Sequence, residues 1–345
     1  MLIKNLKSQY FTVYGVVIEL RTNSRMLLQE MRRYYRAYML KEKKKIQRPG
    51  GSITVIETQR IPEDLLPEKA ICDFSVLSYA THISADDNNQ VFMQEKGKYF
   101  VHIDHTSNRI EYFTKSAEDA LLQIKFSIKI LFNILLEEKG IFPIHCSGAV
   151  GSSGIILFCG HTHSGKTTAL LNSLKHGYRL FSEDRVLFSP RRELLPFSTA
   201  SRIDKNILSR FPDLKKEFKI AANAPRYFKK TKGWYIDLEN LFPAHKEAFN
   251  LDGGVNLVFL NFHNSSESCC RKIGKREAAA RLKDGYIREI NNSLWWMMEK
   301  GDRLKKAGNA YRRLLSGGSI RCHRMLIGRD YDRFSRAVRE VCGVG

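Results

Sequence analysis

Eight residues near the middle of the chain have the types and the spacing needed to bind a phosphate chain. They read Gly160-His-Thr-His-Ser-Gly-Lys-Thr167, which fits the pattern G-x-x-x-x-G-K-[ST]. Glycines allow a tight loop whose backbone N–H groups point at phosphate oxygens, and a following helix adds its positive N-terminal end. Lys166 can reach β- and γ-phosphates, and the Thr167 hydroxyl can bind Mg²⁺. The segment predicts a site for a nucleoside triphosphate such as ATP, together with Mg²⁺.

The segments on both sides of this loop are the ones that such a site needs. An apolar run over 154–159 predicts a strand before the loop, and 164–176 predicts a helix after it. This context argues against a mere glycine-rich turn with an exposed lysine. The residues predicted to hold the nucleotide are Gly160, His163, Ser164, Gly165, Lys166, Thr167 and Thr168.

Two carboxylates follow the next short strand, which is predicted over 178–181. They are Glu183 and Asp184. A right-handed crossover places this strand parallel to the strand of the loop, so its carboxyl end should lie near the bound phosphates. One carboxylate can then hold Mg²⁺ while the other takes a proton from a hydroxyl nucleophile. Two adjacent acidic residues more often lie in a solvated turn. Their position directly after the strand that follows the phosphate-binding loop favours a functional pair.

A histidine precedes the loop by one predicted hairpin. His145 stands near the end of a strand expected to pair with the strand of the loop. A lone histidine is more often structural, yet this location favours a catalytic role as a hydrogen-bond partner of the carboxylates or of the γ-phosphate.

Three segments together resemble the catalytic domain of HPr kinase/phosphorylase. They are His145-Cys-Ser-Gly148, the loop, and His176-Gly-Tyr-Arg-Leu-Phe-Ser-Glu-Asp-Arg-Val186. More broadly, they resemble the bacterial HPr-kinase-like serine kinases, which include kinases that tailor ribosomally made peptides such as lasso peptides. The fold of this family is related to that of phosphoenolpyruvate carboxykinase. The specific motifs cover about residues 143–190.

The resemblance implies a role for each matching residue. Thr167 would bind magnesium, and Glu183 would be the general base on the acceptor hydroxyl. Asp184 would help to hold the metal and would contact His145. Glu183 stands where the family has Asp, and the family's downstream Gly-Ile-Ile-Asp type signature is not found, because 229–239 match it poorly. These departures argue against HPr as the substrate and against phosphorolysis. They favour a kinase of the peptide-tailoring branch.

The elements that must position these residues predict an α/β and α+β fold in two domains. Residues 1–115 are expected to form a small α+β domain, and 116–345 a phosphoenolpyruvate carboxykinase-like P-loop kinase domain with a mixed sheet. Strands are expected at 10–20, 52–57, 76–83, 91–94, 98–104, 109–113, 142–151, 154–159, 178–181, 255–261 and 320–327. Helices are expected at 24–45, 116–139, 164–176, 275–284, 294–315 and 330–341.

Composition restricts the class of protein and of partner. The 345 residues carry 57 Lys and Arg against 36 Asp and Glu, a formal net charge of +21 that favours anionic partners. The seven cysteines include no C-x-x-C pair, and free thiols suit a reducing cytosol. No secretory signal and no membrane-spanning segment is recognised, so a cytoplasmic protein without membrane association is expected.

Three classes of function remain open, namely a kinase, a P-loop NTPase and a nucleotide-sensing module. A kinase acting on a Ser or another hydroxyl of a peptide or protein is favoured by the early carboxylate pair. A P-loop NTPase acting on nucleic acid, a kinase of a small hydroxy-metabolite and a nucleotide-sensing module without catalysis are the alternatives. The basic helix expected at 24–45 could be a solvated face, a docking surface for an acidic leader peptide, or a nucleic-acid surface. Neither the acceptor nor the oligomeric state follows from the residues.

Overall fold

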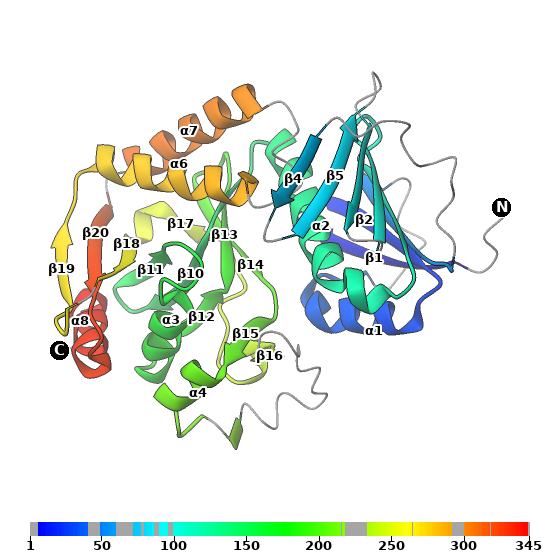
Figure 1. Cartoon of the computed structure of the whole chain (residues 1–345). Coiled ribbons are helices and arrows are strands. Elements are labelled where there is room, and N and C mark those ends of the chain that lie inside the picture. Colours follow the sequence, from blue (N-terminus) through cyan, green and yellow to red (C-terminus); the bar gives the residue numbers. More distant parts are fainter. Residues whose placement is uncertain are drawn as a thin grey trace. The chain divides into compact units, whose positions relative to one another are not determined.

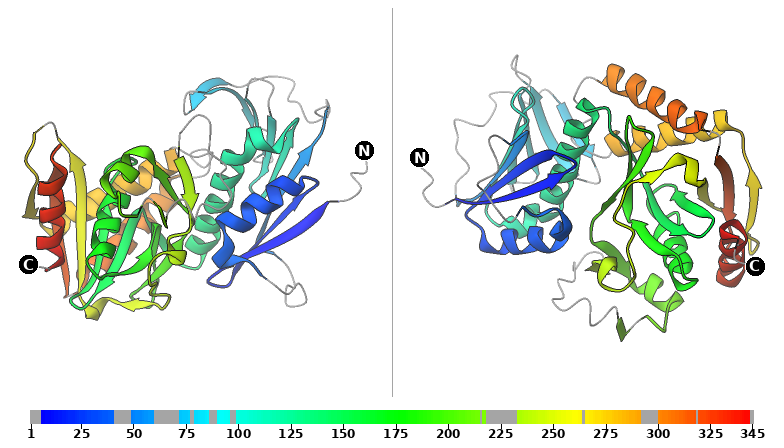
Figure 2. Two further views of the ribbon diagram at one scale, coloured as in Figure 1. Left: turned by 90° about the horizontal axis from the view of Figure 1, so that it is seen from below. Right: turned by 180° about the vertical axis from the view of Figure 1, so that it is seen from behind.

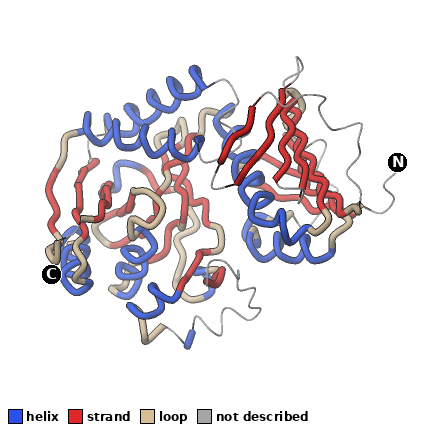
Figure 3. Tube along the Cα trace, in the orientation of Figure 1, coloured by secondary structure: helices blue, strands red, loops and turns tan. Residues whose placement is uncertain are grey.

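The computed structural model describes residues 6–40, 49–59, 72–76, 79–85, 90–95, 99–214, 216–217, 233–263, 265–291, 300–317 and 319–343. The chain divides into two compact units, Met1–Lys139 with Ile290–Glu299, and Gly140–Glu289 with Lys300–Gly345 (Figure 1). Both units combine helices with sheets (Figure 3), which confirms the predicted α/β and α+β class.

The first unit is built on a mixed eight-stranded sheet with the strand order β1-β2-β3-β8-β7-β6-β5-β4. Its strands are β1 (Lys7–Val13), β2 (Val16–Thr22), β3 (Gly51–Glu57), β4 (Cys72–Val76), β5 (Tyr79–Ala85), β6 (Gln90–Glu95), β7 (Tyr99–Asp104) and β8 (Arg109–Thr114). The single strand predicted at 10–20 is instead a hairpin, because Tyr14 and Gly15 both adopt positive φ in a two-residue turn. The strand predicted at 76–83 likewise falls on the hairpin of β4 and β5.

Two helices cover this sheet, α1 (Arg25–Tyr34) and α2 (Ala117–Glu138). The side chain of Ser24 caps α1, and the side chain of Ser116 caps α2. Almost every turn of α2 is buried against β2, β3 and β8. The unit therefore includes α2, whereas the sequence placed the domain boundary at 115/116.

The helix predicted over 24–45 is shorter than expected. It ends at Tyr34, and a 3₁₀ turn at Arg36–Tyr38 follows. Tyr35 is fully buried, its hydroxyl donates to the carbonyl of Lys125 at 2.7 Å, and the N–H of Leu40 then donates to Tyr10. The chain turns so that this ring can enter the core. Of the basic end predicted for the helix, Arg32 and Arg33 lie in α1 and Arg36 in the 3₁₀ turn, whereas the lysines within 41–45 lie outside the described residues.

The second unit holds the predicted loop, and its described residues form three sheets. The largest has the order β12-β10-β11-β18-β20-β19, and another has the order β17-β14-β13-β9. Its strands are β9 (Phe142–Ile144), β10 (Cys146–Gly151), β11 (Gly154–Cys159), β12 (Arg179–Ser182), β13 (Asp184–Phe188), β14 (Glu193–Ser198), β15 (Ser201–Asp204), β16 (Gly233–Ile236), β17 (Phe249–Asn250), β18 (Val255–Phe262), β19 (Cys269–Lys272) and β20 (Ile320–Ile327).

Helices lie on both faces of the six-stranded sheet (Figures 1 and 2). One face packs α3 (Lys166–Lys175) and α8 (Tyr331–Cys342) into one apolar cluster with the strands, and α6 (Lys275–Asn291) and α7 (Lys300–Ser316) lie over the other. A short helix, α4 (Lys205–Arg210), belongs to the same cluster as α3. The predicted helix at 275–284 continues to residue 291, which brings its last turns to the site described below.

One predicted strand proved to be two. The segment 142–151 was expected as one strand, but β9 pairs with β13 while β10 pairs with β11 in the larger sheet. The chain changes sheet at His145, between the two strands. Among the described residues, no helix is both long and apolar enough to cross a membrane.

Candidate functional site

The predicted phosphate-binding loop joins β11 directly to α3. Gly165, the residue before the helix, has φ +93°, a left-handed conformation that favours glycine. A Cβ on Gly160 would overlap the hydroxyl of Ser164 and lie 3.0 Å from the carbonyl oxygen of Leu260. The loop therefore depends on both glycines of the motif. His163 also adopts positive φ, with an exposed side chain, and Thr168 is buried on α3.

The lysine of the motif is folded across its own loop. The ammonium of Lys166 donates to the carbonyls of Gly160 and His161, both at 2.8 Å. Burial lowers the pKa of Lys166, while Asp184, Glu183 and Glu289 oppose that shift. The cation is thus held at the centre of the loop with three carboxylates around it.

The predicted carboxylate pair reaches the loop. The hydroxyl of Thr167 donates to Oε1 of Glu183 at 2.7 Å. The strand that precedes this glutamate, β12, runs parallel to β11 with β10 between them, so its carboxyl end opens at the loop as expected. Burial raises the pKa of Glu183. The hydroxyls of Ser147 and Thr167 act in the opposite direction and lower it, but burial has the larger effect.

Asp184 is the second member of the pair. Its φ of +75° is unusual for a residue that is not glycine, and it opens β13 opposite Ser198. Its carboxylate Oδ2 lies 3.8 Å from Nε of Arg185. Because the backbone turns sharply between Glu183 and Asp184, the two neighbouring carboxylates can face the same loop.

Glu289 joins the predicted histidine to the pair, although it stands more than a hundred residues away in the sequence. Its Oε1 lies 2.7 Å from Nδ1 of His145 and accepts a hydrogen bond from Arg185 at 3.0 Å. All three side chains are mostly buried. Burial alone would raise the pKa of Glu289, but Arg185 and His145 hold it at about 2. A carboxylate this close to Nδ1 restrains the orientation of the imidazole.

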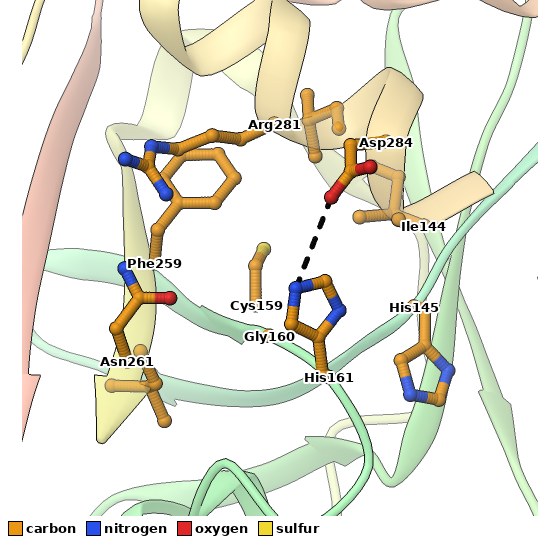
Figure 4. Close-up of a pocket in the computed structure, with 12 residues that line it drawn as sticks. Ile144, His145, Cys159, Gly160, His161, Phe259, Asn261, Arg281 and Asp284 are labelled. Carbon is orange, nitrogen blue, oxygen red and sulfur yellow. Dashed lines mark ion pairs between the residues drawn. The ribbon is translucent and has the colours of Figure 1, made fainter. Parts of the chain in front are cut away.

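A pocket opens beside the first residues of the loop (Figure 4). His161 lies over it and pairs with Asp284 of α6, with 3.8 Å between Nε2 and Oδ2. The guanidinium of Arg281 lies near Phe259 and Asn261, on the other side of the pocket from His145. The lining residues are Ile144, His145, Cys159, Gly160, His161, Phe259, Leu260, Asn261, Arg281, Leu282, Asp284 and Gly285.

The residues present fit a nucleoside triphosphate with Mg²⁺. The hydroxyl of Ser164 is buried inside the loop and has no hydrogen-bond partner in the part of the chain that the structure describes, and the glycines leave room for close approach of an anion. Among the described residues, no group of three or more His, Cys, Asp or Glu side chains could hold a metal ion. Mg²⁺ at such sites needs only one or two protein oxygens besides phosphate oxygens and water, and Thr167 and Asp184 can supply them.

The structure brings the predicted residues together at the carboxyl edge of the six-stranded sheet. Sequence reasoning missed Arg185, Glu289 and Asp284, although Arg185 directly follows the predicted pair. A signal for α6 was available in the spacing of Arg281, Asp284 and Arg288. Residues at i, i+3 and i+7 share one face of a helix, so these charged side chains could have been predicted to lie on the same side.

Comparisons with known proteins give a short match. No family model matches the chain. Seventy residues are 40% identical to phosphoenolpyruvate carboxykinase (ATP) of Geobacillus thermodenitrificans and 41% identical to that of Geobacillus kaustophilus. In both cases the match covers 20% of this chain and 13% of the relative, so the chain spans about an eighth of the curated proteins that it matches. The resemblance to a phosphoenolpyruvate carboxykinase-like P-loop fold is therefore supported over that part of the chain.

Proposed function

We propose that the protein is an ATP- and Mg²⁺-dependent kinase that transfers the γ-phosphoryl group to a hydroxyl. The hydrogen bond from Thr167 to Glu183 carries this proposal, because it joins the loop to the acidic pair at one point. A module that only binds nucleotide would not need two carboxylates there. The partial similarity to an enzyme named for ATP supports ATP as the donor.

In this proposal each residue of the site has one task. Lys166 and the backbone of the loop hold the phosphates, and Thr167 with Asp184 would hold Mg²⁺, which neutralises charge on the transferred group. Glu183 takes the proton of the acceptor hydroxyl while the acceptor oxygen bonds to phosphorus and ADP leaves. A raised pKa suits Glu183 to this task, since a base works best near the operating pH. His145, oriented by Glu289, lines the acceptor side.

The acceptor that we propose is a Ser hydroxyl in a peptide or protein, as the resemblance to HPr-kinase-like serine kinases implies. A lasso-type precursor with an acidic leader is the form that the charge favours. The unit with the loop contains 36 Lys and Arg against 18 Asp and Glu, so +18 of the net +21 lies in it. An acidic segment would therefore be attracted to the unit that carries the site. A cytoplasmic location follows from the same proposal.

A pair of lysines on one helix tests the proposal. Lys166→Ala should abolish ATP consumption and phosphoryl transfer, because it removes the cation held at the loop carbonyls. Lys175→Ala is the matched control, since this lysine pairs with Asp213 at the far end of α3. The measurement is ADP release with Mg²⁺-ATP and serine-containing peptides. Equal activity of the two variants would contradict the proposal.

A further inference from the structure

Phe262 is an exposed aromatic residue at the end of an otherwise buried strand. The first six residues of β18 are buried, whereas 52% of Phe262 is exposed. A single exposed aromatic side chain is ordinary on a protein surface, so its location must decide whether it has a role.

The location is the edge of the sheet where the phosphate-binding loop opens. β18 lies beside β11 and parallel to it, so both strands end at the same edge. Ligands of open α/β sheets bind outside the carboxyl ends of such strands. A Cβ on Gly165 would lie 4.0 Å from Cζ of Phe262, which places the ring next to the first turn of α3.

The ring stands on a rigid support. Phe262 is in register with Ile327 of β20, and the N–H of His263 donates to the carbonyl of Ile327 at 3.0 Å. Ile327 itself is only 3% exposed and lies 3.3 Å from the same Cβ position on Gly165. A buried aliphatic side chain thus lies between the sheet and the loop, and the exposed ring flanks it.

We propose that Phe262 is the stacking residue for the base of the bound nucleotide. A planar ring beside the phosphate-binding loop offers its face to any nucleobase, because every base has a π-face. The inference rests on the proposed binding of a nucleoside triphosphate, and it adds a preference for a nucleotide over an inorganic polyphosphate. An aromatic group on the acceptor is the other occupant that the ring could hold, and the test separates the two.

The test compares ATP with inorganic tripolyphosphate, which carries the phosphates without a base. Calorimetry with Mg²⁺ gives the dissociation constant of each ligand for the wild-type chain, Phe262→Ala and Phe262→Trp. Phe262→Ala should raise the dissociation constant of ATP by about tenfold, which is at the lower end of the range for one stacked base. The dissociation constant of tripolyphosphate should change by less than about twofold. Phe262→Trp should retain ATP binding, because it keeps a stacking face. Phe126→Ala, at another exposed phenylalanine on α2, should change neither ligand.

Each outcome has a defined meaning. Equal weakening of both ligands by Phe262→Ala would show a general effect on the loop and would overturn the inference. Unchanged ATP affinity would also overturn it, and reduced phosphoryl transfer in that case would place the ring at the acceptor. Failure of the wild-type chain to bind either ligand would refute the proposed function as well, whereas intact binding with no selective loss refutes the stacking role alone.

Discussion

Removal of the charge on Glu289 should expose how much the buried cluster contributes to stability. Glu289 has a pKa of about 2, against an ordinary value of 4.5, because Arg185 and His145 overcome the effect of burial. A shift of that size corresponds to roughly 3 kcal/mol of stability at neutral pH. Glu289→Gln also removes the nearer of two carboxylates that pair with the buried Arg185, and breaking one side of a buried pair costs about 3–5 kcal/mol. We therefore expect a loss of about 3 kcal/mol.

The sign of the pH dependence gives an independent check. A carboxylate whose folded pKa is lowered stabilises the chain above its unfolded value, and that contribution is lost as the pH falls toward 2. Urea unfolding of the wild-type chain should therefore show stability falling between about pH 5 and pH 2, and Glu289→Gln should flatten that decline.

A matched control lies on the same helix. Glu277 pairs with Arg281 at 2.9 Å but is 37% exposed, so Glu277→Gln should cost less than about 1 kcal/mol and leave the acid dependence intact. Equal unfolding midpoints for wild type and Glu289→Gln, or the same acid dependence in both, would refute the interpretation of the cluster.

Two further variants test the loop and the first unit. Gly160→Ala should abolish ATP binding in calorimetry with little change in the thermal midpoint, since the new methyl group overlaps Ser164 inside the loop; retained affinity would show that the loop does not need the glycine. Burial lowers the pKa of Lys125 to about 8, so its charged form destabilises the fold, and that penalty fades as the pH rises from about 8 toward 10.5. The thermal midpoint of Lys125→Met at about pH 7 should therefore be at least as high as that of the wild type. A clearly lower midpoint would contradict this account.

Local sequence signals sufficed to locate the loop and its partners. The glycines, the lysine and the apolar run before them specify a strand, a loop and a helix between Gly154 and Lys175. A right-handed crossover makes the short strand before Glu183 parallel to the strand of the loop. The approach of the acidic pair to the loop could therefore also be predicted. Ser24 and Ser116 were recognisable as caps because their side chains satisfy the first N–H groups of a helix.

Contacts between distant segments could not be predicted in the same way. The meeting of Glu289 with His145 depends on the order of strands in the larger sheet and on the length of α6. The change of sheet at His145 could not be predicted, since this histidine is the one residue between β9 and β10 and no turn separates them. The early end of α1 depends on the burial of Tyr35 against α2, a tertiary contact that outweighs helical periodicity.

The direct test of the central claim is to follow the fate of the γ-phosphate by ³¹P nuclear magnetic resonance. Wild-type protein with Mg²⁺-ATP and a pool of serine-containing peptides should give ADP and a phosphomonoester signal, and Asp184→Asn should reduce that signal far more than it reduces ATP binding. Inorganic phosphate as the product whatever acceptor is offered, or full transfer by Asp184→Asn, would contradict the account.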